Sequence, residues 1–582
     1  MGGIIGRLLH EFAVTIIVAV LVSGMVSLTL TPLLCSRWLH RDQGRHGRMY
    51  QMFEHAFDAW RDAYDRSLRW VLDHQRFTLL LFFGSIVLTV VLFRSASYGL
   101  LPNDDTGQLI GSTEGAQDIS FDAMAQKQQQ AANLIRQSPD VDATMAFIGS
   151  GSSSGLNQGR ILVRLKPPSE RPSADTVLQH LRPKLASIPG FKVFLQNIPV
   201  IRIGGQSTKA QYQYTLQDAD LEELYQWAPK LADKLSTMDG FLDVNTDQQL
   251  RLPKVIVHID RAHAAALGVT PDEIENALYS AYGARQVSSI YTPSNQYAVI
   301  MELLPQFQMD PQALSLLYVQ GTGSTLVPLS AVASFERSVG PLSVSHLGQL
   351  PSVTVSFNLK PGLALGDAVK SVNRAQEELK MPDTLLGSFQ GAAQAFQSSL
   401  GNMGLLLTAA ILVIYIVLGI LYESFVHPIT ILSGLPSAGM GAVATLMLFG
   451  LDVNLYAFVG IIMLIGIVKK NAIMMIDFAL EAQRHQNMAP HEAIYQACII
   501  RFRPIMMTTM AALFGTLPIA LGIGAGGDSR RPLGLCVVGG LLVSQMLTLY
   551  LTPVIYLYLD RLGRRLSRRR GEPPADAPVV AA

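Results

Sequence analysis

Seven apolar runs, each about 20 residues long, constrain the fold of this chain more than any other feature. They lie at 12–34, 77–96, 402–422, 429–449, 457–481, 504–524 and 533–559. A helix of that length spans the hydrocarbon core of a bilayer. Only 15% of the 582 residues are charged, whereas a soluble domain normally carries about 25%. The sequence therefore predicts an α-helical transmembrane bundle of seven spans. The first run has no basic leader or cleavage site, so we interpret it as a span and not as a signal peptide.

The distribution of arginine predicts how this bundle is oriented. The tail 561–582 and the segment 35–76 are rich in arginine, and such loops stay in the cytoplasm. Loop 482–503 follows the same rule, and Arg530 and Arg531 alone depart from it. This orientation exports the long segment 97–400 and leaves 77–96 and the helices of 401–560 in the membrane.

The cytoplasmic segment 35–76 contains apolar residues at helical spacing. They are Phe53, Phe57, Trp60, Tyr64, Leu68 and Val71. This pattern predicts an amphipathic helix. Two placements remain open: on the inner surface of the membrane, or packed on the protein's own loops.

The exported segment 97–400 alternates helical and strand patterns. Helices are expected near 118–137, 174–187 and 219–237, with strands such as 143–150 and 160–167 between them. This alternation is typical of repeated βαβ units in an α+β fold of ferredoxin-like type. Two such subdomains, with a β-rich insertion at about 284–335, would account for the length.

A glycine- and serine-rich loop, 148–159, lies between two predicted strands. Its candidate functional residues are Gly149, Gly151, Gly155, Asn157 and Gly159. It lacks the Lys-Ser/Thr ending of a phosphate-binding loop, which excludes a nucleotide site of that type. A flexible hairpin connection is the interpretation that the residues alone favour. The alternative is a mobile gate beside a binding cleft.

Two lysines, Lys469 and Lys470, occupy the middle of the run 457–481. A charged side chain there costs about 2.5–3.5 kcal/mol on insertion scales. A lysine near a helix end can reach the headgroups, but one in the middle cannot easily do so. Asp477 is about two turns away, and Glu423 lies just beyond the end of another span. Lys470 is therefore expected to need an acidic partner that this chain lacks.

An intramembrane lysine that faces carboxylates can work as a switch driven by proton binding. Asn471 is a polar neighbour, and Arg501 lies at the inner edge of the next helix. Thr508 lies two turns deeper and could hydrogen-bond within a proton relay. Bonding back to its own helix is an equally good interpretation of Thr508.

The sequence gives little support for a nucleic-acid-binding protein, a metal or disulfide site, or an enzyme. A net charge of +1 argues against a nucleic-acid protein. Cys35, Cys498 and Cys536 lie in or beside apolar runs, which favours packed side chains over a disulfide or metal site. No cofactor site, nucleophile–base set or phosphate cradle is evident, so we do not expect an enzyme.

Several long motifs, in the same order, resemble the resistance-nodulation-division (RND) drug efflux pumps of Gram-negative bacteria. They are "SLTLTPLLC", "LPNDDTG", "IDRAHAAALGVTPDEIENAL", "GIIMLIGIVKKNAIMMIDFA" and "RFRPIMMTT". Two further stretches, "STKAQYQYTL" and "YIVLGILYESFVHPITILSGLPSAG", resemble especially the Mdt-type branch, whose pumps combine two related subunits.

The resemblance implies a proton-driven antiporter of the inner membrane that exports drugs and other amphiphilic compounds without a cofactor, using the proton-motive force. It implies a trimer of identical or related subunits, a periplasmic adaptor protein and an outer-membrane channel as partners. Segment 97–400 would be the periplasmic porter domain, and 284–335 its docking insertion. Lys470 would be the relay lysine, with Lys469 before it, Thr508 the relay threonine and Arg501 an arginine at the cytoplasmic end. Loop 148–159 would be the switch loop, which strengthens the gate interpretation.

The chain also departs from the family pattern, in which twelve spans and two exported segments are expected. Residues 1–34 resemble the last helix of the first half, and the remainder resembles the second half. We therefore expect a truncated product that is inactive alone and lacks the half that carries the relay aspartates. Two alternatives are a membrane-anchored periplasmic binding or sensing protein, and a lipid- or protein-export relative with the same architecture.

Overall fold

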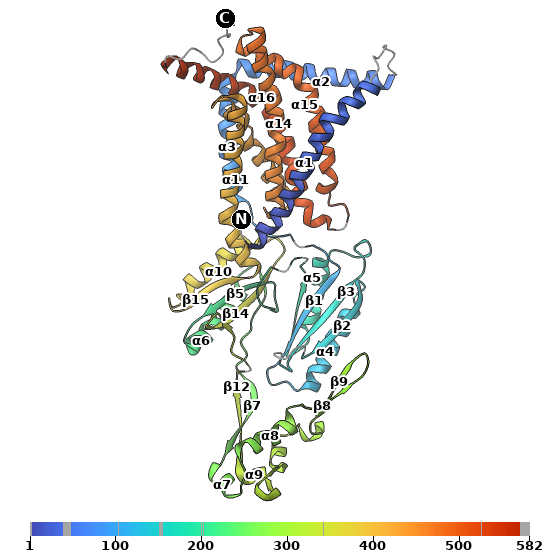
Figure 1. The fold of residues 1–582 in the computed structure, drawn as a ribbon, viewed down its shortest axis with the longest axis vertical. Helices are drawn as coiled ribbons and strands as arrows, with labels where there is room; N and C mark the ends of the chain where they lie inside the picture. Colours follow the sequence, from blue (N-terminus) through green and yellow to red (C-terminus); the bar gives the residue numbers. More distant parts are fainter. Residues whose placement is uncertain are drawn as a thin grey trace.

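The computed structural model describes residues 3–38, 48–102, 104–149, 155–199, 201, 203–341, 343–524 and 526–570. These residues form a helical bundle at one end, two α/β units in the middle and a smaller unit at the far end (Figure 1). Within them, seven helical segments are long and apolar enough to cross a membrane. The predicted α-helical bundle with an α+β domain is therefore confirmed.

The membrane bundle is built around α14, α15 and α16, while α1 crosses it diagonally with largely exposed side chains (Figure 1). The fourth span is broken into two helices at Ser433 and Gly434. The bundle helices are α1 (Gly3–Trp38), α3 (Gln75–Ser95), α11 (Ala392–Tyr422), α12 (His427–Leu432), α13 (Leu435–Leu448), α14 (Leu455–Gln486), α15 (Pro490–Ala520) and α16 (Gly527–Arg570).

Glycines allow α13 and α16 to pack closely. A Cβ on Gly539 would stand 1.8 Å from Thr445 Oγ1, and one on Gly441 would stand 2.7 Å from the Gly539 carbonyl oxygen. A Cβ on Gly540 would stand 2.2 Å from Leu464 of α14. Small residues at helix contacts let backbones approach in membranes, so these glycines fix how the central helices meet.

The amphipathic helix α2 (Arg48–Asp73) lies across the end of the bundle and packs on α15 and α16 (Figure 1). Tyr64 stacks on Phe502 with ring centroids 4.6 Å apart, and its hydroxyl donates to the Leu549 carbonyl at 2.9 Å. The placement against the protein itself is thus observed, and the contacts named here are made with the helices α15 and α16. Phe53 and Trp60, on the first half of the same helix, are exposed.

The first α/β unit is a four-stranded antiparallel sheet with strand order β2-β3-β1-β4. This order and the β-α-β-β-α-β sequence are those of a ferredoxin-like fold, as predicted. Leu109, Ile161 and Leu195 of the sheet form one core with Ile135 and Leu181 of the helices. The elements are β1 (Gln108–Gly115), α4 (Phe121–Arg136), β2 (Val141–Ile148), β3 (Gln158–Leu165), α5 (Ala174–Ala186) and β4 (Phe191–Asn197).

The second α/β unit repeats this topology, with β14 between β6 and β5, and β15 on the other edge of β5. The short strand β13 (His346–Leu347) adds to β14. Val355 and Phe357 of β14 pack on Leu231 and Val372 of the helices. The elements are β5 (Tyr212–Gln217), α6 (Leu221–Thr237), β6 (Phe241–Thr246), β14 (Leu350–Leu359), α10 (Leu365–Leu379) and β15 (Leu386–Gln390).

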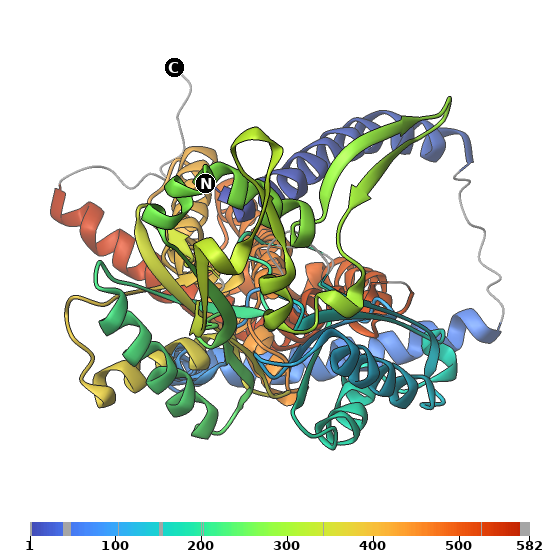
Figure 2. The same cartoon turned by 90° about the horizontal axis from the view of Figure 1, so that it is seen from below.

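The distal unit is inserted between β6 and β14 and is connected by a two-stranded ribbon of β7 (Leu252–Ile259) and β12 (Ala333–Gly340). The predicted insertion 284–335 lies inside it, but the unit begins at Leu252 because β7 pairs with β12. The hairpin of β8 (Arg285–Tyr291) and β9 (Gln296–Met301) reaches out sideways (Figure 2). The other elements are α7 (Arg261–Ala266), α8 (Pro271–Tyr282), β10 (Tyr318–Gln320), β11 (Leu326–Pro328) and α9 (Leu329–Val332).

Candidate functional site

The two lysines of α14 have opposite environments. Lys469 is buried in the bundle with 6% of its surface exposed, whereas Lys470 is exposed. Consecutive residues of an α-helix point about 100° apart, so the two ammonium groups leave α14 on different faces. Within the described part of the chain, neither lysine forms an ion pair.

Lys470 belongs to a stripe on α14 that the rest of the described chain leaves uncovered. Gly466 and Asp477, four residues before and seven residues after Lys470, are also exposed. Asp477 makes no ion pair with Lys470 among the described residues, which fits the expected separation of about two turns. A lysine and an aspartate are costly on the open face of a membrane helix, because ionisable groups in a membrane usually pair with other groups.

Asn471 points the other way, into the bundle, where it joins a buried polar cluster. Its amide nitrogen donates to Gln545 Oε1 of α16 at 2.7 Å and to Thr509 Oγ1 of α15 at 3.2 Å. Thr509 in turn donates to Gln545 Oε1 at 3.0 Å. The sequence predicted Asn471 as a polar neighbour but missed Thr509 and Gln545. Gln545 had a signal, because it is a lone amide inside the apolar run 533–559.

Thr508 and Arg501 are not brought into this cluster. The Thr508 hydroxyl donates to the Ile505 carbonyl of its own helix at 3.1 Å, which is the second of the two interpretations weighed from the sequence. The Arg501 guanidinium lies over the ring of Phe478 at 5.1 Å from its centroid. Their assignment to a proton relay stays a prediction.

The ends of the glycine-rich loop are anchored between β2 and β3. Gly149 has a φ of +64°, a backbone conformation that favours glycine. At Gly159, a Cβ would stand 2.5 Å from the Phe147 carbonyl oxygen, so no larger residue fits. Both polar atoms of the buried Asn157 side chain lack a partner among the described residues. Gly155 is buried, and Gly151 lies outside the described residues.

A polar cavity of about 290 Å³ borders the end of this loop. It lies between the two α/β units and is lined by residues that include Gly159, Arg160, Lys209 and Asp247. Lys209 bridges the units through an ion pair with Glu114 at 2.8 Å. Burial raises the pKa of Asp247 above its ordinary value.

A second cavity, of about 220 Å³, lies where the two units meet the outer ends of the bundle helices. Ile110, Ile203 and Tyr456 give it apolar walls, and Arg160 and Gln213 give it polar groups. Arg160 lines both cavities. Concave sites that combine apolar walls with a few polar groups are typical of small-molecule binding.

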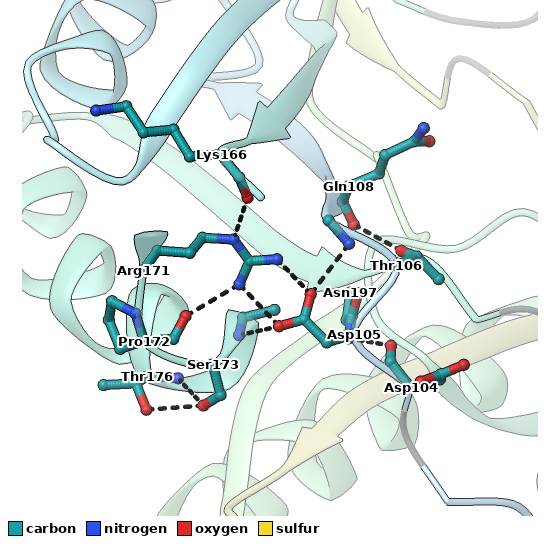
Figure 3. Close-up of polar contacts among 12 residues, drawn as sticks. Asp104, Asp105, Thr106, Gln108, Lys166, Arg171, Pro172, Ser173, Thr176 and Asn197 are labelled. Atoms are coloured by element: carbon teal, nitrogen blue, oxygen red, sulfur yellow. Dashed lines mark hydrogen bonds and ion pairs between the residues drawn. The ribbon is translucent and has the colours of Figure 1, made fainter. Parts of the chain in front are cut away.

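The motif "LPNDDTG" connects the membrane helix α3 to β1 and has a structural role (Figure 3). Asp105 accepts two hydrogen bonds from the Arg171 guanidinium at 2.6 and 2.7 Å and one from the Ala174 N–H at 2.8 Å. Burial alone would raise the pKa of Asp105, but these donors and the Gly107 N–H outweigh it and lower the pKa. The pair fastens the connection to the start of α5.

Comparison with known proteins agrees with this architecture. The model of the AcrB/AcrD/AcrF family matches residues 1–560. Over 570 residues the chain is 47% identical to the multidrug resistance protein MdtC of Escherichia coli O139:H28, covering 98% of this chain and 55% of that protein. The same values hold for MdtC of Escherichia fergusonii. The chain thus spans about half the length of the curated relatives that it matches.

A solved structure shares the fold. The crystal structure of a heavy metal efflux pump superposes with a TM-score of 0.78 at 24% identity, over 87% of this chain and 53% of that one. The family match, the MdtC relatives and the seven apolar helices agree with one another. The chain belongs to the AcrB/AcrD/AcrF family of RND efflux pumps, as a multi-pass protein of the inner membrane.

Proposed function

We propose that this chain contributes to a proton-driven pump that exports drugs and other amphiphilic compounds. The observation that carries the proposal is Lys470, a cation on the open face of a membrane helix with no acidic partner in the described chain. An ionisable group in that position marks ion or proton pathways. No cofactor is required, because the energy would come from the proton-motive force.

Lys470 would work with carboxylates in the part of the pump that this chain does not match. When the carboxylates are ionised, they attract the ammonium group; when they take up protons, the attraction is lost and the helices can shift. Lys469, Asn471, Arg501 and Thr508 would support this relay. That residues 1–582 alone do not transport stays a prediction, which reconstitution of the chain by itself would test.

The α/β units would bind the exported compound on the periplasmic side of the membrane. The cavity with Ile110, Ile203 and Tyr456 offers the mixture of apolar and polar groups that an amphiphile needs. Loop 148–159 ends at the neighbouring cavity and would gate passage between them. A trimer of identical or related subunits, a periplasmic adaptor, docked on the distal unit, and an outer-membrane channel would complete the path.

The test is Lys470→Ala in the complete pump, reconstituted in proteoliposomes with an imposed proton gradient and the fluorescent amphiphile Nile red. Loss of a proton-transfer group typically lowers rates by about 100-fold or more, and we expect this loss for efflux. Lys370→Ala, on the exposed surface of α10, is the matched control. Equal efflux by the two variants would contradict the relay.

A further inference from the structure

The polar cluster beside Lys470 lies at one level of the bundle and joins its three central helices. We call Asn471, Thr509 and Gln545 the amide clamp. All three side chains are buried, with 4–6% of their surfaces exposed. Gln545 Oε1 accepts from both of the other residues, so α14 and α15 are tied to the same atom of α16.

We infer that Gln545 and Thr509 are positioning residues for Lys470, which they orient through Asn471. The inference rests on the proposed role of Lys470 in proton coupling. Asn471 directly follows Lys470, and its side chain leaves α14 about 100° further around the axis. Holding Asn471 against α15 and α16 therefore fixes the rotation of α14 and directs Lys470 to the open face.

The position of the clamp along α14 supports this role. A second hydrogen bond between side chains of α14 and α16 joins the Gln483 amide nitrogen to the Tyr556 hydroxyl at 2.9 Å. It lies 12 residues from Asn471, about 18 Å along the helix axis. The clamp thus controls the rotation of α14 at the level of Lys470, and the Gln483 bond does so near the end of the helix.

The chemistry of the clamp also indicates that its hydrogen bonds orient α14 more than they stabilise the packing of the three helices. The Gln545 amide nitrogen reaches Met506 Sδ at 3.6 Å, and a thioether is a weak acceptor. Apolar side chains of similar size would hold three membrane helices together by packing without this incompletely paired amide. The directional bonds of Asn471 and Thr509 supply what packing does not, a defined rotation of α14.

The experiment compares clamp variants with matched controls in the complete pump. Gln545→Leu and Thr509→Val remove clamp bonds with little change in volume, and Thr509→Ser restores the hydroxyl. Gln483→Leu is the control for a lost amide bond between the same helices. Thr516→Val is the control on α15, since the Thr516 hydroxyl bonds back to its own helix.

Two readouts are measured. One is the maximal rate and the KM of proton-driven Nile red efflux. The other is the rate at which N-ethylmaleimide labels Lys470→Cys in each background, followed by peptide mass spectrometry. Loss of one or two interhelical hydrogen bonds corresponds to a factor of roughly three to ten. We expect both clamp variants to lower the maximal rate by this factor with KM unchanged, and Thr509→Ser to restore it.

Labelling at Lys470→Cys should fall by roughly threefold in both clamp backgrounds, because a released α14 rotates position 470 toward the bundle interior. Labelling equal to that of the two control backgrounds would overturn the inference, as would failure of Thr509→Ser to restore transport. If Lys470→Ala itself leaves efflux unchanged, the proposed function fails. The labelling result would then still show whether the clamp orients position 470.

Discussion

Arg171 in the first α/β unit and Lys470 in the membrane bundle are both cations, but their surroundings and partners differ. The Arg171 side chain is fully buried and bonds to Asp105 and to the carbonyls of Lys166 and Pro172. Lys470 is exposed on its helix and has no ion pair within the described chain.

This difference separates a structural charge from a functional one. A buried charge whose nitrogen atoms all find acceptors inside its own unit holds that unit together, and its loss is costly. An intramembrane charge without an internal partner contributes little to its own bundle and points to something outside it. Measurements of stability test this distinction.

Arg171→Met should lower the free energy of unfolding by about 3–5 kcal/mol, because it leaves Asp105 in a partly buried site without its partner. Arg164→Met, in β3 of the same α/β unit, is the matched control. Arg164 pairs with Asp142 at 2.6 Å, the same distance as in the buried pair, but both side chains are exposed. Its loss should cost about 0–1 kcal/mol. The measurement is denaturant unfolding of the full chain in detergent. Equal losses of unfolding free energy for the two variants would contradict the structural role of the buried pair.

Lys209→Met should lower the free energy of unfolding by about 1.5–3 kcal/mol, the usual contribution of a hydrogen bond to a charged group. Lys209 is largely buried and joins the two α/β units through Glu114. The control is Lys370→Met, which removes an exposed pair within α10. Amide hydrogen exchange of the residues that line the cavity between the two units should become faster in Lys209→Met. Unchanged exchange rates there would count against a bridging role of Lys209.

The Asp105 pair should also make the first unit sensitive to acid. The pKa of Asp105 is lowered in the folded protein. Its stabilisation is therefore complete above the unfolded value of about 3.9 and is lost as the pH falls through the folded pKa. Exchange of the Ala174 amide, corrected for its intrinsic rate, should rise below about pH 4. The Asp105→Asn variant should lack this acid-dependent step, and its persistence there would assign the step to another group.

Lys470→Met should change the free energy of unfolding by less than about 0.5 kcal/mol, as expected for an exposed residue that forms no ion pair among the described residues. Denaturant unfolding of the full chain in detergent measures this change. The same measurement on Lys469→Met gives the contrast, because Lys469 is buried in the bundle. A large loss of stability for Lys470→Met in this chain would mean that the ammonium group has an internal partner. Lys470 would then resemble Arg171, and its assignment as a functional charge would fail.

Much of the fold could be predicted because it follows from local patterns. Long apolar runs gave the seven spans, and alternating periodicities gave most elements of the two ferredoxin-like units. The strand β1 was missed. It contains Gly111 and Gly115, and glycine is depleted in strands. Yet β1 is a central strand, because it pairs with β3 on one side and β4 on the other. A Cβ at Gly111 would stand 2.8 Å from Leu195, so the packed sheet itself favours glycine at this position.

The candidate site was only partly predictable for a related reason. A single sequence marks Lys469 and Lys470 as unusual, but it does not say which lysine faces the interior. The same limit applies to Thr508 and Thr509, of which the second joins Asn471 and Gln545. Neighbouring residues on a helix differ in direction by about 100°, so the rotation of each helix decides which one meets a partner.

From the sequence alone one could predict that this chain inserts into a membrane, has an α+β domain between two of its apolar helices and carries a charge that apolar helices do not accommodate without a partner. These properties depend on local composition and periodicity, which act within single elements. Four features became clear only in the folded structure: the start of the distal unit, the packing of α2, the outward direction of Lys470 and the hydrogen bond between Asn471 and Gln545. Those features depend on contacts between residues far apart in the chain, and such contacts form only when the helices and sheets pack together.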